Sequence, residues 1–272
     1  MKLGHKKFNK IVILTGAGIS AESGIKTFRD SNGLWENHQI EEVATPEAFQ
    51  KNPQLVWKFY SMRRAQASKA LPNRAHVELV KFAEEFTGSV HLITQNVDHL
   101  HFISDPRELL PPTPMHGSLH QSRCSRCGNL YFDDVAYFNE TGEYAPTNTE
   151  LCSKEEKASE NYLHQYQIKY ADFLPLSPCC ETIIRPHIVW FGEIPLHMPK
   201  IEKLLRECDL FISIGTSGVV YPAAGFLQVA KNHGATTICI NKEKIPQSNL
   251  IDHFFEGLAS EKVPECLKLL LG

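Results

Sequence analysis

An apolar run from Ile11 to Thr15 leads directly into the segment Gly16-Ala17-Gly18-Ile19-Ser20. The run has the length and composition of a buried strand, and a helical pattern begins at Ser20, directly after the two glycines. A strand, a glycine turn and a helix in this order bring backbone N–H groups and a helix N-terminus against a phosphate group. The segment therefore predicts one unit of an α/β fold with a phosphate-binding loop.

Three more apolar runs have the character of buried strands, and helical patterns lie between the runs. The strands are expected at Val90–Thr94, Leu210–Gly215 and Thr237–Asn241, and the helices at Pro53–Ser68, Ala75–Phe86 and Ile201–Arg206. Strands that alternate with helices predict a Rossmann-like, doubly wound parallel sheet. In such α/β folds ligands bind beyond the carboxyl ends of the strands.

The composition argues against several classes of partner. The 272 residues carry a net charge of −3 and a pI near 6.5, so no charge excess favours a nucleic acid or a membrane surface. No stretch approaches the ~20 apolar residues that cross a bilayer. The lysines before Ile11 are followed by an apolar run that is too short for a signal peptide. We therefore expect a soluble, cytoplasmic protein with no nucleic-acid or membrane partner, and the sequence indicates no oligomeric state.

Five of the eight cysteines lie between positions 124 and 180, which is typical of a metal site rather than of a disulfide framework. Cys124 and Cys127 have the spacing of a zinc knuckle. The polar region 119–182 is therefore predicted to be a small inserted zinc-binding module. It would divide the nucleotide-binding domain into residues 1–118 and 183–272, with a helical insertion at about 33–71.

Three further polar segments complete a pattern with the glycine loop. They are Gln95-Asn96-Val97-Asp98, His116-Gly117 and Gly215-Thr216-Ser217, in this order along the chain. Together with Arg185-Pro186 and Val189-Trp190-Phe191-Gly192-Glu193, they resemble the sirtuin family of NAD-dependent protein-lysine deacylases. The resemblance covers most of the chain outside positions 131–176.

The glycine loop alone also fits the fingerprint of ordinary dehydrogenases. Those enzymes usually place an acidic residue ~20 positions further on, at the end of the second strand, where it holds the adenine ribose. Here a loop from Ser23 to Asp30 follows instead, so hydride transfer is disfavoured. The resemblance implies that NAD is bound and consumed as a co-substrate. It assigns the cofactor contacts to Gly16, Ala17, Gly18, Ser20, Phe28, Arg29, Gln95, Asn96, Asp98, Gly215, Thr216, Ser217, Asn241 and Ala259.

His116 is the candidate general base. Imidazole has an unperturbed pKa near 6.5 and is the side chain best suited to move a proton at neutral pH. In the family mechanism the acyl oxygen of the modified lysine attacks C1′ of the nicotinamide ribose, and nicotinamide leaves. The resemblance implies that His116 then accepts a proton from a ribose hydroxyl. The products would be nicotinamide, O-acyl-ADP-ribose and free lysine, so acyl-lysine proteins or peptides are the expected partners.

Tyr60 and Arg63 are three residues apart on a predicted helix and hence share one face. This pair resembles the signature of class III, desuccinylase-type sirtuins, in which Ala44 would match the small residue of a widened acyl pocket. A guanidinium beside a phenol can pair with the carboxylate of a succinyl or malonyl group. The spacing alone does not choose between Arg63 and Arg64. The alternative is that Phe59 or Tyr60 packs in the core and that both arginines are solvated. The resemblance adds Val189 and Phe191 as walls of the lysine tunnel.

The resemblance also locates the second half of the structural zinc site. The second cysteine pair of the family falls just before the segment that begins at Arg185, and Cys180 occupies its last position. Ser177 stands where the other cysteine is expected. Cys179 and Cys152 are equal candidates for the fourth ligand, and Cys179 could join Cys180 only if the backbone bends between them.

Two other functions stay open at this point. A plain protein deacetylase would use the same NAD chemistry without the acidic-acyl preference. A non-catalytic module that senses NAD or ADP-ribose would bind the nucleotide without turnover, but such a binder has no need of His116.

Overall fold

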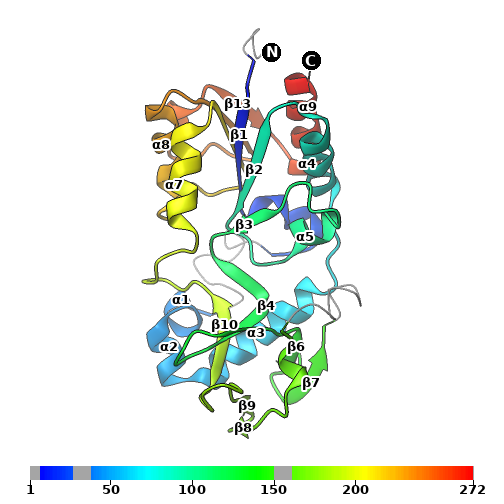
Figure 1. Cartoon of the computed structure of the whole chain (residues 1–272), viewed down its shortest axis with the longest axis vertical. Coiled ribbons are helices and arrows are strands. Elements are labelled where there is room, and N and C mark those ends of the chain that lie inside the picture. Colours follow the sequence, from blue (N-terminus) through cyan, green and yellow to red (C-terminus); the bar gives the residue numbers. More distant parts are fainter. Residues whose placement is uncertain (1–6, 27–37, 150–160, 272) are drawn as a thin grey trace.

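The central sheet of this computed structural model, which describes residues 7–26, 38–149 and 161–271, has six parallel strands. Their spatial order is β13-β12-β11-β1-β2-β3 (Figure 1). The bounds are β1 (Lys10–Thr15), β2 (Ser89–Thr94), β3 (Pro112–Pro114), β11 (Leu210–Ile214), β12 (Thr236–Asn241) and β13 (His253–Glu256). Counted in chain order within the sheet, this is the Rossmann order 3-2-1-4-5-6, whose switch point lies between β1 and β11. The predicted doubly wound sheet is confirmed.

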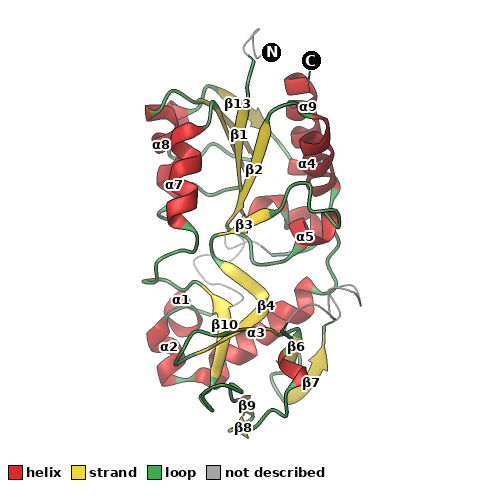
Figure 2. Cartoon of the chain, in the orientation of Figure 1, coloured by secondary structure: helices red, strands yellow, loops and turns green. Residues whose placement is uncertain are grey.

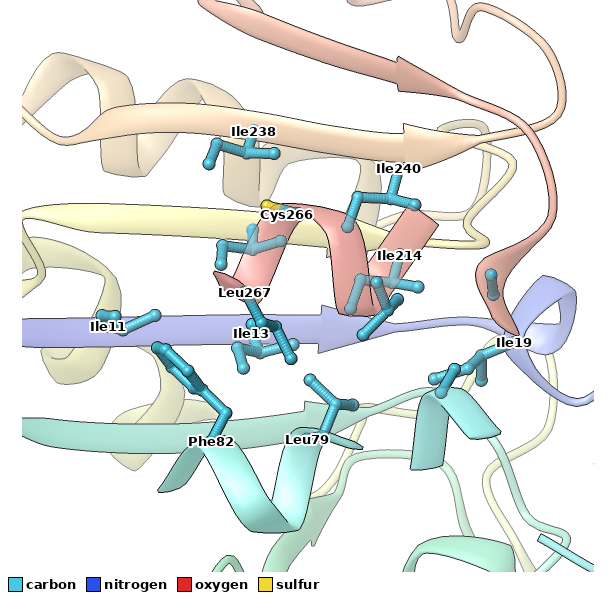
Figure 3. Packing of buried hydrophobic residues seen from close by; sticks show 14 of the residues in the cluster. Ile11, Ile13, Ile19, Leu79, Phe82, Ile214, Ile238, Ile240, Cys266 and Leu267 are labelled. Atoms are coloured by element: carbon cyan, nitrogen blue, oxygen red, sulfur yellow. The ribbon is translucent and has the colours of Figure 1, made fainter. Parts of the chain in front are cut away.

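Helices cover both faces of this sheet (Figure 2). On one face lie α4 (Arg74–Glu85) and α9 (Ala259–Leu271), and on the other lie α7 (Met198–Glu207) and α8 (Phe226–Asn232). Successive side chains of β1 alternate between the two layers, as a strand with both faces covered requires. Ile11 and Ile13 pack with Leu79, Phe82 and Leu267 (Figure 3), whereas Val12 and Leu14 pack against α7 and α8.

The strands and helices expected from the sequence are present, with ends that shift by one to three residues. Two strands of the central sheet were not expected, β3 and β13. Pro112 and Pro114 in β3 remove backbone donors, which an edge strand tolerates. The expected helix after the glycine loop is a correction, because the chain forms two three-residue 3₁₀ turns instead, η1 (Ala17–Ile19) and η2 (Ala21–Ser23).

A second group of elements lies below the sheet in Figure 1. Its β-structure consists of a three-stranded antiparallel sheet and two short hairpins, and its helices belong to the predicted helical insertion. The strands are β4 (Gly117–Cys124), β5 (Leu130–Phe132), β6 (Val135–Phe138), β7 (Tyr144–Asn148), β8 (Tyr170–Ala171), β9 (Leu174–Pro175) and β10 (Ile184–Ile188). The helices are α1 (Ile40–Val43), α2 (Pro46–Lys51) and α3 (Pro53–Ala67). Short elements elsewhere are α5 (Leu100–Ser104), η4 (Leu163–Gln165), η5 (Ala223–Gly225) and η6 (Ser248–Leu250).

Helix α3 joins the helical insertion to the β-structure. Trp57, which is fully buried, donates its indole N–H to the carbonyl of Ile184 at 3.0 Å and packs against Tyr137 and Phe138. Helix α3 and this β-structure therefore share one core, and α3 is held against β4, β6 and β10. In the described part of the chain, no helix is long and apolar enough to cross a membrane.

Candidate active site

The glycine loop packs directly on the loop that follows β11. Gly16 donates its N–H to the Ile214 carbonyl, and Gly18 donates to the Gly215 carbonyl, both at 2.9 Å. A Cβ on Gly18 would lie 2.6 Å from the Gly215 Cα, and Gly215 itself has a φ of +62°. Only glycine fits where two backbones approach this closely. The N–H groups of Gly16 and Gly18 thus donate within the protein, and the binding of a phosphate group by this loop stays a prediction.

The loop after β2 is tied to the glycine loop by its polar side chains. Asn96 donates its amide N–H to the Gly16 carbonyl at 3.1 Å and to the Ser20 hydroxyl at 3.2 Å. Asp98 is buried and accepts the Leu100 N–H at 3.1 Å. Burial raises the pKa of Asp98, while hydrogen bonds from Ser20 and Leu100 and the nearby positive charge of Arg63 act against that rise.

His116 lies next to this loop, where β3 ends. Its Nδ1 is 3.0 Å from the Gln95 carbonyl oxygen. A carbonyl can only accept, so Nδ1 carries the proton and Nε2 presents its lone pair. Burial lowers the pKa of His116, and the Gln95 hydrogen bond opposes part of this effect. The imidazole is therefore neutral near pH 7 and able to accept a proton at Nε2.

The chain beyond β10 borders the same place. Val189 donates its backbone N–H to the His116 carbonyl at 2.9 Å, and Phe191 donates its backbone N–H to the Ala44 carbonyl at 3.0 Å. Ala44 is buried, whereas Phe191 keeps 49 % of its surface exposed. The segment 189–191 thus contacts both the candidate base and the candidate small pocket residue.

Between Val189 and Phe191 stands Trp190, whose indole reaches helix α3. Its Nε1–H donates to the Tyr60 hydroxyl oxygen at 2.9 Å, and both side chains are buried. Burial raises the pKa of Tyr60 far above its ordinary value, so the phenol stays protonated at any physiological pH. Tyr60 therefore keeps a proton that it can donate.

The two neighbouring arginines of α3 have different surroundings. Arg64 is fully enclosed and pairs with Asp133 at 2.9 Å. It also donates to the carbonyls of Leu119, Gln121 and Val135 and to the Ser122 hydroxyl. Arg63 lies one residue earlier, and its positive charge acts on both Tyr60 and Asp98. Arg64 is thus bound by the scaffold, whereas Arg63 lies near enough to Tyr60 and Asp98 for its charge to act on both.

The remaining predicted cofactor residues lie beyond β11 and β12. Asn241 donates its side-chain N–H to the Thr216 carbonyl at 2.9 Å, and Ser217 accepts the Val219 N–H at 3.4 Å. Ala259 begins helix α9 and is buried against Ile19 and neighbouring core residues. These residues lie at the carboxyl ends of the strands, where the fold binds ligands. Phe28 and Arg29 lie outside the described residues.

Four thiols gather in the second group of elements. The Sγ atoms of Cys124, Cys127, Cys179 and Cys180 all lie within 4.8 Å of one another. Cys179 and Cys180 lie in a turn, which supplies the bend that lets adjacent side chains converge. Four thiolates at these distances fit tetrahedral zinc, with Zn–S bonds of about 2.3 Å. The cluster favours Cys179 as the fourth ligand, while Cys152 lies outside the described residues.

Two partners of the site were not assigned a role from the sequence. Trp190 makes the hydrogen bond to Tyr60, and Arg185 places its guanidinium carbon 3.4 Å from the centre of the Trp190 ring. Both belong to motifs that carry the family resemblance, but their contacts join segments far apart in the chain. Membership in these two motifs was the signal in the sequence that could have drawn attention to Arg185 and Trp190.

The fold and the site together define a Rossmann-like nucleotide-binding protein with a buried histidine beyond the carboxyl ends of β2 and β3 and a four-thiol cluster that fits a zinc ion. The model of the Sir2 family matches residues 16–222. The chain belongs to the Sir2 family.

Relatives of nearly the same length support this assignment. An "NAD-dependent protein deacylase" of Pasteurella multocida is 43 % identical over 265 residues, covering 96 % of this chain and 98 % of the relative. A protein of the same name from Vibrio vulnificus is 44 % identical over 270 residues, covering 97 % and 95 %. The crystal structure of a Sir2 homologue–NAD complex superposes with a TM-score of 0.77 at 32 % identity, covering 97 % of this chain and 91 % of the other.

Proposed function

We propose that this protein is an NAD-dependent protein-lysine deacylase that prefers succinyl and malonyl groups and removes acetyl groups more weakly. NAD-dependent deacylation is supported by the family and by the names of the relatives. A neighbour of 26 % identity and TM-score 0.70, a Sir2–p53 peptide–NAD⁺ complex, supports protein or peptide substrates.

The proposed preference for acidic acyl groups rests on the different surroundings of Arg63 and Arg64. Arg64 is held by Asp133 and by four other oxygen acceptors of the scaffold. The positive charge of Arg63 acts on Tyr60, and burial keeps the Tyr60 phenol protonated, so that it can donate a hydrogen bond. A cation and a phenol O–H side by side are complementary to a carboxylate, and they offer nothing comparable to an acetyl methyl group.

The other site residues would then have these roles. His116 accepts a proton at Nε2 from a ribose hydroxyl, because its Nδ1 is occupied by the Gln95 carbonyl. Asp98 and Asn96 bind the nicotinamide end of the co-substrate, and Val189 and Phe191 border the acyl-lysine. When bound, NAD supplies the electrophilic ribose carbon that accepts the acyl oxygen. The glycine loop and the loops with Thr216, Ser217 and Asn241 hold its ADP-ribose part.

The four-cysteine cluster would hold a structural zinc ion. Four thiolates fill a tetrahedral shell and leave no open position for a substrate or water. The metal would stabilise the turn at Cys179 and the end of β4 without taking part in the reaction.

The test compares one peptide in succinyl-lysine and acetyl-lysine form, with and without NAD, by following nicotinamide release and peptide mass. We expect NAD-dependent desuccinylation with a kcat/KM well above that for deacetylation. His116→Ala should abolish turnover of both peptides while NAD still binds. A preference for acetyl would identify a plain deacetylase, and NAD binding without turnover of either peptide would indicate a nucleotide-sensing module.

A further inference from the structure

The direction of the hydrogen bond between Trp190 and Tyr60 determines what the phenol can do. An indole N–H only donates, so in this 2.9 Å contact the Tyr60 oxygen is the acceptor. The phenol proton therefore points away from the indole nitrogen. Tyr60 is fully enclosed, and its ring is 5.0 Å from Phe59 and 6.4 Å from Trp190, which restricts where that proton can point.

Trp190 is itself held rigidly by a charged cluster. Glu193 accepts the Trp190 backbone N–H at 2.8 Å and binds the Arg185 guanidinium through both carboxylate oxygens, at 2.7 and 2.9 Å. The Arg185 guanidinium carbon lies 3.4 Å from the centre of the indole ring, and Arg185 donates to the Ile188 carbonyl at 2.9 Å. Arg123 adds a fourth hydrogen bond to Glu193 at 3.0 Å. A bidentate pair of this kind fixes geometry as well as charge.

We propose that Trp190, clamped by Arg185 and Glu193, is a positioning residue for acyl selectivity, which orients the Tyr60 hydroxyl as a donor to the carboxylate of an acidic acyl group. This inference rests on the proposed preference for succinyl and malonyl lysine. An acetyl group has no carboxylate for Tyr60 to bind, so its turnover does not depend on where that proton points.

The test is Trp190→Phe, which keeps an aromatic ring under Arg185 and removes the N–H. We expect KM for the succinyl peptide to rise about tenfold, the effect of one neutral hydrogen bond, with kcat nearly unchanged. The decisive quantity is the ratio of succinyl to acetyl kcat/KM, because a general disturbance of the segment lowers both values together.

Trp57→Phe is the matched control. Trp57 is equally buried and its indole N–H makes a bond of nearly equal length, 3.0 Å, to a carbonyl outside the candidate site. We expect this variant to lose stability but to keep the ratio. A second test compares Tyr60→Phe with the double variant Tyr60→Phe/Trp190→Phe. If Trp190 acts through the Tyr60 hydroxyl, the second change has no further effect on the ratio.

The outcomes separate this inference from the proposed function. A wild-type protein that does not favour succinyl over acetyl overturns the proposed acidic-acyl preference, and the inference falls with it. A wild-type protein that favours succinyl, with a ratio that Trp190→Phe leaves unchanged, overturns the inference alone. The same holds if Trp57→Phe changes the ratio as much, or if the effects of Tyr60→Phe and Trp190→Phe on it simply multiply.

Discussion

Arg63 and Arg64 are adjacent in the sequence, and we predict opposite consequences when each is replaced. Arg64 has no exposed side-chain surface and pairs with Asp133, which is equally enclosed. Arg63 is nearly buried and acts on Tyr60 and Asp98. Arg64→Leu should therefore lower the free energy of unfolding, and Arg63→Met should lower desuccinylation.

The expected cost of Arg64→Leu follows from the charge that it leaves behind. Asp133 would retain hydrogen bonds from Ser122 and Tyr137 but lose the positive charge of Arg64 beside it. Removing one member of a buried ion pair typically costs 3–5 kcal/mol. Domains of this kind have a total stability of roughly 5–15 kcal/mol, so urea unfolding should show a large fall in the midpoint.

Arg63→Met removes a charge without opening the scaffold. The positive charge of Arg63 acts against the rise in the pKa of Asp98, so its loss should raise that pKa further and lower the stability of the folded state somewhat. Loss of one partner of a buried charge pair with the acyl carboxylate is worth about 2–5 kcal/mol. The kcat/KM for the succinyl peptide should therefore fall about 30- to 4,000-fold, while deacetylation changes little.

Steady-state kinetics on both peptides, together with urea unfolding of both variants, decide the matter. The reasoning is refuted if Arg63→Met lowers succinyl and acetyl turnover equally, because Arg63 would then serve only as a counter-ion for Asp98. It is also refuted if Arg64→Leu keeps full stability and loses the succinyl preference.

Three further predictions concern the glycine loop, the thiol cluster and the buried histidines. Gly18→Ala places a Cβ 2.6 Å from the Gly215 Cα, so calorimetry should show weaker NAD binding and a free energy of unfolding lower by about 1–3 kcal/mol. In the control Gly225→Ala the nearest neighbour of the new Cβ is 3.8 Å away, so NAD binding and stability should not change. Cys179→Ser should lower both the melting temperature and the zinc content measured by elemental analysis. Cys152→Ser should leave both quantities unchanged. Loss of zinc from Cys152→Ser but not from Cys179→Ser would identify Cys152 as the ligand. Burial holds the pKa values of His101 and His120 well below 6.5, so the unfolded chain binds more protons than the folded protein below that pH. Each histidine should therefore lower the free energy of unfolding by up to about 1.4 kcal/mol per pH unit as the pH falls from 6.5. An unfolding free energy that stays flat from pH 6.5 to 5 would contradict this.

The parallel sheet could be predicted because four of its strands, β1, β2, β11 and β12, are built on largely apolar runs. Burial on both faces requires such runs, and the run Leu210–Gly215 differs from the observed β11 by a single residue. Strand β3 could not be predicted from pattern, since two of its three residues are proline. The 3₁₀ turns at Ala17 and Ala21 also escaped prediction, because a helical pattern in sequence does not distinguish a tight turn from a full helix.

The candidate site was predictable as a set of segments but not as a set of contacts. Tyr60 and Trp190 are 130 residues apart, and no local spacing connects them. The choice between Cys179 and Cys152 depended on a turn at Cys179 and Cys180 that strand periodicity does not encode. In each case the deciding information is the tertiary position of a side chain whose local sequence allows two roles.

Helix geometry explains why two adjacent arginines of α3 can have different roles, Arg64 in the scaffold and Arg63 at the candidate site. Neighbouring residues of an α-helix differ by about 100° in direction, so Arg63 and Arg64 cannot face the same surroundings. Arg64 turns toward carbonyls of β4 and β6 and fixes the rotation of the helix about its axis. That rotation also sets the direction of Arg63 and, one turn earlier, of Tyr60. A buried pair such as Arg64–Asp133 contributes little net stability compared with an apolar core, but it holds one helix rotation in preference to others. Selectivity for an acidic acyl group would then depend on Arg64 indirectly, through the orientation of the helix, and on Arg63 by direct contact.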